Sequence, residues 1–212
     1  MDLADGPGAP FLLVSPPFSK DTQRLTRSHY AVVAAAVFAV ILLGGLAIYF
    51  WQAQPAPPTQ EELAADFAKG VQYERGSGVT LDYVQALGWY RKAAEGGYPQ
   101  AEYAVGLMTA AGHGVVRDEK AANDWFRRAA EHGFAEAQVT FAGNLLTGTV
   151  DGKPDKVEAL KWLLLGADAM PDPLSKQVAV TTRETLAKEL SAEDRAEATK
   201  RADAWRKEHA AQ

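Results

Sequence analysis

The 212-residue chain is mildly acidic, with 27 Asp and Glu residues against 22 Lys and Arg, and it contains no cysteine. Without cysteine the chain has no disulfide framework, no thiolate catalysis and no Cys-ligated zinc or iron–sulfur site. Phosphate binding needs clustered Lys and Arg side chains, and the sequence has no basic run. Composition therefore argues against redox, Cys-ligated metal and nucleic-acid functions.

The first 29 residues are rich in Gly, Pro and Ser. Such a composition cannot bury enough apolar surface to fold alone, so residues 1–29 are predicted to be a disordered tail. The apolar stretch Phe11–Val14 leaves open a short docking motif that folds on binding.

Residues 30–51 are predicted to form one transmembrane helix. The segment Ala31–Trp51 carries no charge, and at about 1.5 Å per residue it spans roughly 31 Å, close to the hydrocarbon thickness of a bilayer. Tyr30 and Trp51 stand where aromatic rings favour the membrane–water interface. A cleaved signal peptide is the alternative, but its apolar run would be only about 7–15 residues long.

The charges that flank this segment predict its orientation. Lys20, Arg24 and Arg27 precede it, whereas Glu61 and Glu62 follow it. The positive-inside rule then predicts a cytoplasmic N-terminal tail. We expect a single-pass protein of a bacterial inner membrane, with the remainder of the chain in the periplasm. The proline-rich residues 52–60 are expected to be a semi-extended linker.

Residues 61–170 contain an internal repeat of about three dozen residues, a period within the range of solenoid proteins. The stretch Ala65–Gly97 matches Ala101–Gly133 in register, and a third copy with one inserted residue follows it. The units are therefore placed at 61–97, 98–133 and 134–170. Matching elements in the first two copies are Gly76-x-Gly78-Val79 with Gly112-x-Gly114-Val115, Asp82 with Asp118, and Trp89-Tyr90 with Trp125-Phe126.

Each unit is predicted to be a pair of antiparallel helices. The first helices are expected at Glu61–Arg75, Pro99–Ala111 and Ala135–Thr147, and each is followed by a glycine suited to a left-handed C-cap. The second helices are expected to start at N-capping aspartates, and two of these have a capping-box partner three residues on. The aspartates are Asp82, Asp118 and Asp155, and the partners are Gln85 and Glu158. One tryptophan in each second helix is expected to fill the space between the helices, namely Trp89, Trp125 and Trp162.

This pattern of alanine, Gly-x-Gly-Val, aspartate, Trp-aromatic and Ala-Ala-Glu-x-Gly resembles the Sel-one-like repeat, a relative of the tetratricopeptide repeat. The resemblance covers about Glu61–Met170. It implies an all-α fold in which three helix-turn-helix repeats form a right-handed α-solenoid. Lys69 departs from the family pattern, which usually has leucine there, and this suits a first repeat with no preceding neighbour.

Residues 171–212 are predicted to form two C-terminal capping helices, at about Leu174–Leu190 and Ala192–His209. Ser191 and Asp194 have the spacing of a capping box. A solenoid needs a polar terminal cap, and this charged pair of helices, with Trp205 as its anchor, would supply it.

No enzymatic activity, metal or cofactor is expected. The four histidines are scattered without a metal-ligand spacing, and the residues that recur do so once per repeat, whereas catalysis needs one asymmetric site. Gly76-x-Gly78 follows a helix instead of a strand, so it indicates a turn and not a phosphate-binding loop.

In tetratricopeptide-like folds the first helices line the inner surface that binds peptides or partner helices, and the resemblance transfers this role to the present chain. The alternative is that this face only covers the neighbouring repeat or the capping helices. Residues expected to bind a partner are Phe67, Val71, Glu74, Arg75, Tyr103, Leu107, Ala111 and Asn144, with Val139 and Thr147 in the same rows.

These features predict a membrane-anchored adaptor or regulator that binds a protein partner in the periplasm. By analogy with the family, a sensor kinase or a subunit of an envelope complex is the expected class of partner. Two alternatives remain: a small accessory subunit that acts through its transmembrane helix, and a periplasmic hydrolase, which would require an asymmetric acid–base pair in a cleft.

Overall fold

The structure is a computed structural model, and it describes residues 38, 40, 42 and 56–210. The predicted tail and most of the predicted transmembrane helix lie outside these residues. Of the latter, Phe38, Val40 and Leu42 are described as helical and exposed. No helix among the described residues is long and apolar enough to cross a membrane.

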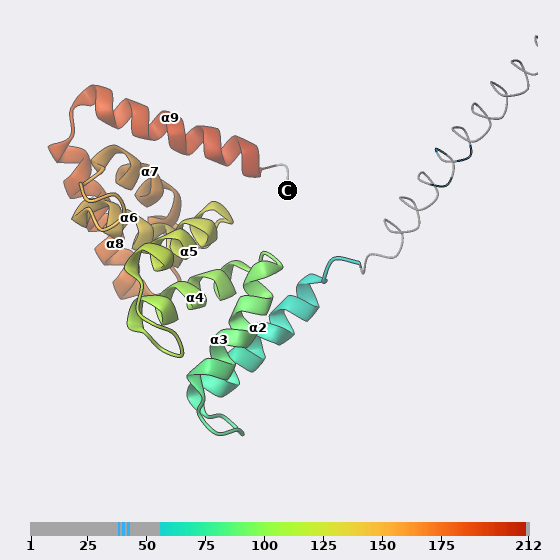
Figure 1. Cartoon of the computed structure of the whole chain (residues 1–212). Coiled ribbons are helices and arrows are strands. Elements are labelled where there is room, and N and C mark those ends of the chain that lie inside the picture. Colours follow the sequence, from blue (N-terminus) through green and yellow to red (C-terminus); the bar gives the residue numbers. More distant parts are fainter. Residues whose placement is uncertain (1–37, 39, 41, 43–55, 211–212) are drawn as a thin grey trace, which may run out of the picture. The chain divides into compact units, whose positions relative to one another are not determined.

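The chain divides into two units, residues 1–56 and 57–212, and the second is all-α in its described part. It consists of paired helices: α2 packs on α3, α4 on α5 and α6 on α7, and each pair contacts the next (Figure 1). The helices are α2 Gln60–Arg75, α3 Tyr83–Glu95, α4 Pro99–Ala111, α5 Glu119–Glu131, α6 Ala135–Thr147, α7 Lys156–Gly166, α8 Pro173–Glu189 and α9 Ala192–His209, with a 3₁₀ turn at Ala167–Ala169 between α7 and α8. The predicted first helices of the three repeats are confirmed.

The turn between the two helices of a repeat is fixed by glycine and aspartate. Gly112 ends α4 with φ of 75°, a left-handed conformation that favours glycine. At Gly114 an added Cβ would lie 2.5 Å from the Tyr83 carbonyl oxygen of the first repeat, so this turn packs against its neighbour. The Asp118 carboxylate then accepts a 2.9 Å hydrogen bond from the Ala121 N–H and starts α5.

The two predicted capping boxes do not form. The Asp82 and Asp155 carboxylates cap the second helices. The backbone N–H of Asp82 donates to the Tyr73 carbonyl oxygen of the preceding helix, and that of Asp155 donates to the Leu145 carbonyl oxygen. Gln85 and Glu158 therefore have no free aspartate N–H from which to accept a hydrogen bond. A complete capping box stands instead at the start of α2, where Thr59 and Glu62 bind each other's backbone N–H groups.

The residue that fills the centre of each repeat is the one after the tryptophan. Tyr90, Phe126 and Leu163 are buried. Trp89 and Trp125 are only partly buried and lie under cations, with Lys69 Nζ 4.2 Å from the Trp89 ring centroid and Arg128 Cζ 4.5 Å from that of Trp125. Trp125 still packs from the edge against the core of the first two repeats, so the predicted packing role is wrong for Trp89 alone among these two.

Trp162 in the third repeat is buried because α9 covers it. The Trp205 ring of α9 meets the Trp162 ring edge to face at 6.4 Å between centroids, and Arg206 Nη2 donates to the Leu164 carbonyl oxygen at 2.7 Å. Ala198 and Ala202 are fully buried, and such small side chains allow two helices to approach closely. Helix α9 therefore extends the core beyond the repeats, as the predicted cap requires.

Helix α8 begins at Pro173 and not after it. Proline is favoured at the first helical position, where its missing N–H needs no partner. The Asp172 carboxylate completes this start by accepting a 2.7 Å hydrogen bond from the Ser175 N–H. Pro173 thus opens the capping pair as well as ending the third repeat.

Candidate protein-binding groove

The first helices of the second and third repeats form an apolar hollow together with α8. We call it the A-helix groove; its volume is about 510 Å³ and none of its lining side chains is charged. Its principal apolar side chains are Tyr103 of α4, Val139 and Leu146 of α6, Met170, and Leu174 and Val178 of α8.

Tyr103 forms one wall and is held from within the protein. Its ring lies 5.5 Å from the Phe126 ring and 5.3 Å from the Phe134 ring. Its hydroxyl is 3.1 Å from Thr140 Oγ1, a hydrogen bond in which either oxygen can donate. Tyr103 therefore offers a fixed aromatic surface to the groove.

The opposite wall is the outer stripe of α8. Leu174 is 74% exposed and Val178 is 59% exposed, and their spacing of four places them on one helix face. Leu107, one turn beyond Tyr103 on α4, is 46% exposed. Large apolar side chains exposed next to a hollow mark a contact surface more often than isolated ones do.

The hollow continues along α8 toward its C-terminal end. A second depression of about 380 Å³ is lined by Leu146, Thr181, Thr185 and Leu186, and it ends at the Lys156–Glu189 ion pair, whose Nζ and Oε2 are 2.8 Å apart. The surface therefore changes along α8 from apolar, through threonine hydroxyls, to one exposed pair of charges.

The residues predicted in the first repeat are not part of this groove. Phe67 and Val71 pack against the core shared by the first two repeats, and the Phe67 ring lies 5.3 Å from that of Tyr90. Glu74 accepts a 2.6 Å hydrogen bond from the Tyr90 hydroxyl, and burial together with this bond raises the pKa of that phenol. Arg75 is exposed at the end of α2.

The remaining predicted residues divide between groove and scaffold. Tyr103 and Val139 line the groove, whereas Ala111 and Thr147 are exposed at the ends of their helices. Asn144 stabilises the altered third turn. Its Nδ2 donates to Asn123 Oδ1 at 2.6 Å, and the Asn123 amide donates to the Thr149 carbonyl oxygen.

Sequence reasoning missed the contribution of α8. The signal was the spacing of Leu174, Val178 and Thr182, which recurs every four residues and places these side chains along one face of the helix. It was overlooked because α8 lacks the repeat motif and was assigned to a cap.

The nearest arrangement to an acid–base pair among the described residues is Glu102 with His132. Glu102 Oε2 lies 2.7 Å from His132 Nδ1, and Oε1 lies 3.1 Å from Arg128 Nη2. Glu102 is 0% exposed and so has no access to a substrate. These contacts join α4 to the C-terminal end of α5.

The fold and the paired repeats define a tetratricopeptide-like helical repeat protein. The model of one repeat family, the Sel1 repeat, matches residues 62–98, 99–134 and 142–169. A Sel1 repeat protein from Oxalobacter formigenes, known from a crystal structure, is 34% identical, with a TM-score of 0.50 and coverage of 57% of this chain and 89% of that one. The chain therefore belongs to the Sel1 repeat family, as its sequence pattern predicted.

A second crystal structure shares the fold. It is that of a protective antigen present in uropathogenic Escherichia coli strains, described as displaying an SLR fold; it is 22% identical with a TM-score of 0.52, and the match covers 70% of this chain and 38% of that one. No curated protein sequence matches the chain. Sel1 repeat proteins generally mediate protein–protein interactions, and the A-helix groove is a surface suited to that role.

Proposed function

We propose that the chain is a membrane-anchored adaptor or regulator whose A-helix groove binds one apolar helix face of a partner protein. The observation that supports this most is the uncharged groove lined by the exposed side chains of Leu174 and Val178. Leaving such side chains in water costs free energy, about 25 cal/mol per Å² of apolar surface, which a partner's apolar surface would recover.

The proposed occupant is an amphipathic helix. Recognition by a groove between helices uses apolar anchors spaced at three and four residues, and the groove walls here are themselves helices that present anchors with that spacing. An occupant with a charge at the centre of its contact face is disfavoured, because no side chain of the groove lining could pair with that charge.

The proposed anchoring and compartment rest on the sequence. An uncharged segment at residues 31–51 with Lys and Arg on its N-terminal side supports a single span with the repeats on the periplasmic side of a bacterial inner membrane. A partner in the same membrane or in the periplasm, such as a sensor kinase or a subunit of an envelope complex, would lie within reach of the short linker that precedes α2.

The test is a crosslinking pull-down from native membranes with the full chain and two double variants. Leu174→Ser/Val178→Ser removes the apolar wall of the groove. Gln177→Ser/Glu184→Ser changes two exposed residues of the same helix that do not line it. Circular dichroism first establishes equal helical content.

We expect one membrane or periplasmic protein to be recovered with the intact chain and with the Gln177/Glu184 variant, and to be at least tenfold depleted with the Leu174/Val178 variant. Equal recovery with all three proteins would contradict the groove as the binding surface. Loss of the partner on exchange of residues 31–51 for an unrelated apolar span, with the groove intact, would favour the accessory-subunit alternative.

A further inference from the structure

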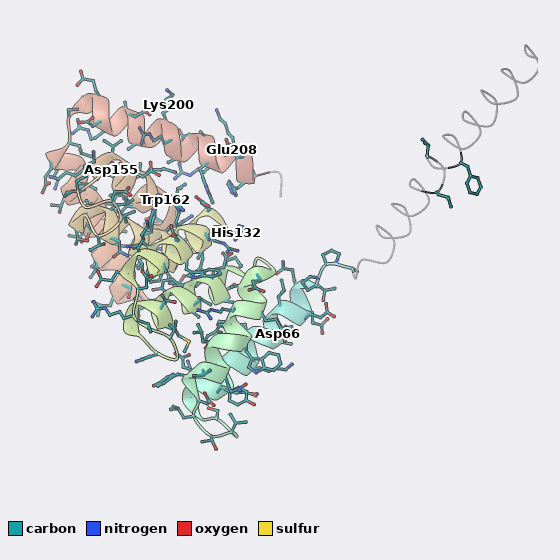
Figure 2. The ribbon with its side chains drawn as sticks, viewed as in Figure 1. Asp66, His132, Asp155, Trp162, Lys200 and Glu208 are labelled. Atoms are coloured by element: carbon teal, nitrogen blue, oxygen red, sulfur yellow. The ribbon has the colours of Figure 1, made fainter. Side chains whose placement is uncertain are left out.

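A larger hollow lies among the second helices of the repeats and carries charge. It is formed by α5, α7 and α9 with the turn before α7, and we call it the B-helix cleft. Its volume is about 740 Å³, within the roughly 300–1,000 Å³ of typical ligand sites. Figure 2 labels four of its residues from these different elements, namely His132, Asp155, Trp162 and Glu208.

Aromatic side chains line the interior of this cleft. The Trp162 ring lies 6.0 Å from the Phe141 ring and 6.4 Å from the Trp205 ring, and Trp205 stacks on His209 at 4.0 Å. Trp162 is 2% exposed, and the buried indole N–H groups of Trp162 and Trp205 have no hydrogen-bond acceptor among the described residues. An indole N–H is a donor that a buried site usually satisfies.

The rim of the cleft is acidic. Six carboxylates and three Lys or Arg side chains line it, and Arg127 and Lys161 are already paired, with Asp124 and Glu158. Within the described part of the chain, three of the carboxylates form no ion pair or hydrogen bond: Glu131, Asp151 and Glu208. Among the described residues, Lys120 is the one cation of the lining without an ion pair, so an excess of negative charge is left for a ligand.

We infer that the B-helix cleft is a second docking site and that it takes a basic segment of a partner protein. Lys or Arg side chains of the segment would pair with Glu131, Asp151 and Glu208, while an aromatic or aliphatic side chain would pack on Trp205, which is only partly buried. Lys161 Nζ already lies 4.0 Å from the Trp162 ring centroid, so the free carboxylates recognise the cations of the segment. Backbone carbonyls of an extended segment would supply acceptors for the indole N–H groups once the side chains that bury them move aside.

Two features favour a peptide segment over a small polyamine. The cleft is several times larger than a thin aliphatic amine needs, since its volume is that of a site for a drug-sized ligand. Its rim also carries Lys120, whose charge is opposite to that of the free carboxylates. A rim with both signs of charge favours one direction of a bound peptide over the reverse. The chain would then hold two partner segments at once, an apolar helix in the A-helix groove and a basic segment in the B-helix cleft.

The experiment uses the full chain in neutral detergent micelles with its five tryptophans replaced by 5-fluorotryptophan. Fluorine signals are assigned by single Trp→Phe variants. The probe is the acetylated and amidated hexapeptide Lys-Ser-Lys-Tyr-Lys-Ser, and the comparison ligands are the same peptide with Glu in place of Lys, and spermidine. We expect the basic peptide alone to shift the Trp162 and Trp205 signals, and to leave those of Trp89 and Trp125 in place.

Charge-neutral variants then locate the binding site. Glu131→Gln/Glu208→Gln should raise the peptide Kd at least tenfold, a result measured by the same titration. The matched control is Glu95→Gln/Glu184→Gln, which removes two exposed carboxylates elsewhere, Glu95 being the first-repeat counterpart of Glu131; it should leave the Kd unchanged. The proposal is overturned by unshifted Trp162 and Trp205 signals, by spermidine or the acidic peptide acting equally well, or by equal loss in both variants.

Discussion

The second and third repeats differ in two buried features: the residues packed at the centre of the helix pair, and a polar side chain buried on the first helix. At the centre of the helix pair, the second repeat combines Gly106 with Phe126, whereas the third combines Ala142 with Leu163. A Cβ on Gly106 would lie 2.5 Å from the Phe126 ring, so a larger residue at one position requires a smaller one at the other. Residues that vary between repeats thus vary in matched pairs.

The second difference is at the polar side chain buried on the first helix of each repeat, which is Glu102 in the second repeat and Gln138 in the third. Glu102 is neutralised by Arg128, whose Nη2 also donates to the Ala94 carbonyl oxygen. In the third repeat Gln138 occupies the equivalent position, and its amide donates directly to the Ala130 carbonyl oxygen at 3.1 Å. Leu165 stands where the cation would be. A neutral amide needs no counter-charge, which explains why the arginine is dispensable there.

The first repeat resembles the second but ends the stack. Asp66 pairs with Lys92 at 2.8 Å and with Lys69 at 3.5 Å. Both lysines lie over Trp89, and Lys69 replaces the leucine expected in this family. Charged stems therefore cover the first tryptophan at the position where a further repeat would otherwise pack.

The largest effect is expected from breaking the buried ion pair. Arg128→Leu removes the arginine partner of the Glu102 carboxylate, which is 0% exposed and keeps only the His132 imidazole beside it. We expect a loss of about 3 kcal/mol in the free energy of unfolding, at the low end for buried pairs because Arg128 is 43% exposed. Urea unfolding followed by circular dichroism measures it.

The third repeat supplies the control for that change. Glu102→Gln/Arg128→Leu copies the pair Gln138 and Leu165 into the second repeat, and it should lie within about 1 kcal/mol of the unmodified protein. A double variant as unstable as Arg128→Leu alone would show that the two repeats do not use equivalent solutions.

A smaller loss in the free energy of unfolding is expected when the alanine of the third repeat is combined with the phenylalanine of the second. Gly106→Ala forces a methyl group against the Phe126 ring and should cost about 2 kcal/mol by overpacking. Adding Phe126→Leu restores the combination of the third repeat, so the double variant should be more stable than the sum of the single losses by about 1 kcal/mol. Strictly additive losses in urea unfolding would refute the matched pairing.

The N-cap is common to both repeats, and its removal should cost the same in each. Asp118→Ala and Asp155→Ala each remove a carboxylate that accepts a 2.9 Å hydrogen bond from a helix N–H. Each should lower the free energy of unfolding by about 1 kcal/mol. A loss in only one of them would mean that the altered third turn has taken over the capping role.

The smallest effect distinguishes the glycines of these repeats. Gly143 of α6 is exposed, and an added Cβ would meet nothing within 4 Å. Gly143→Ala should therefore stabilise the protein by about 0.5–1 kcal/mol, because alanine loses less backbone entropy on helix formation. The midpoint of urea unfolding should rise, in contrast to its fall in Gly106→Ala; a fall in both would contradict the packing difference.

The helices could be predicted from the sequence because each boundary is a local event. Glycines with left-handed geometry and capping aspartates recur with the repeat, so α2, α4 and α6 were placed to within a residue. Pairs such as Glu102 with Arg128 could not be predicted from the sequence, because the two residues belong to different helices. Their contact is seen only in the structure, and its role becomes clear when the repeats are superimposed. The row predicted in the first repeat lies apart from the A-helix groove, because Phe67 packs against the core and α8 supplies the second wall.

The proposed binding of a partner helix in the A-helix groove can be tested by photo-crosslinking in native membranes. In the full chain, p-benzoylphenylalanine is placed at Val178, inside the groove, or at Glu184, on the same helix outside it. We expect one crosslinked partner from position 178, with the crosslink mapped to an apolar helix face, and none from position 184. Equal crosslinking from both positions, or crosslinking from 184 alone, would contradict it.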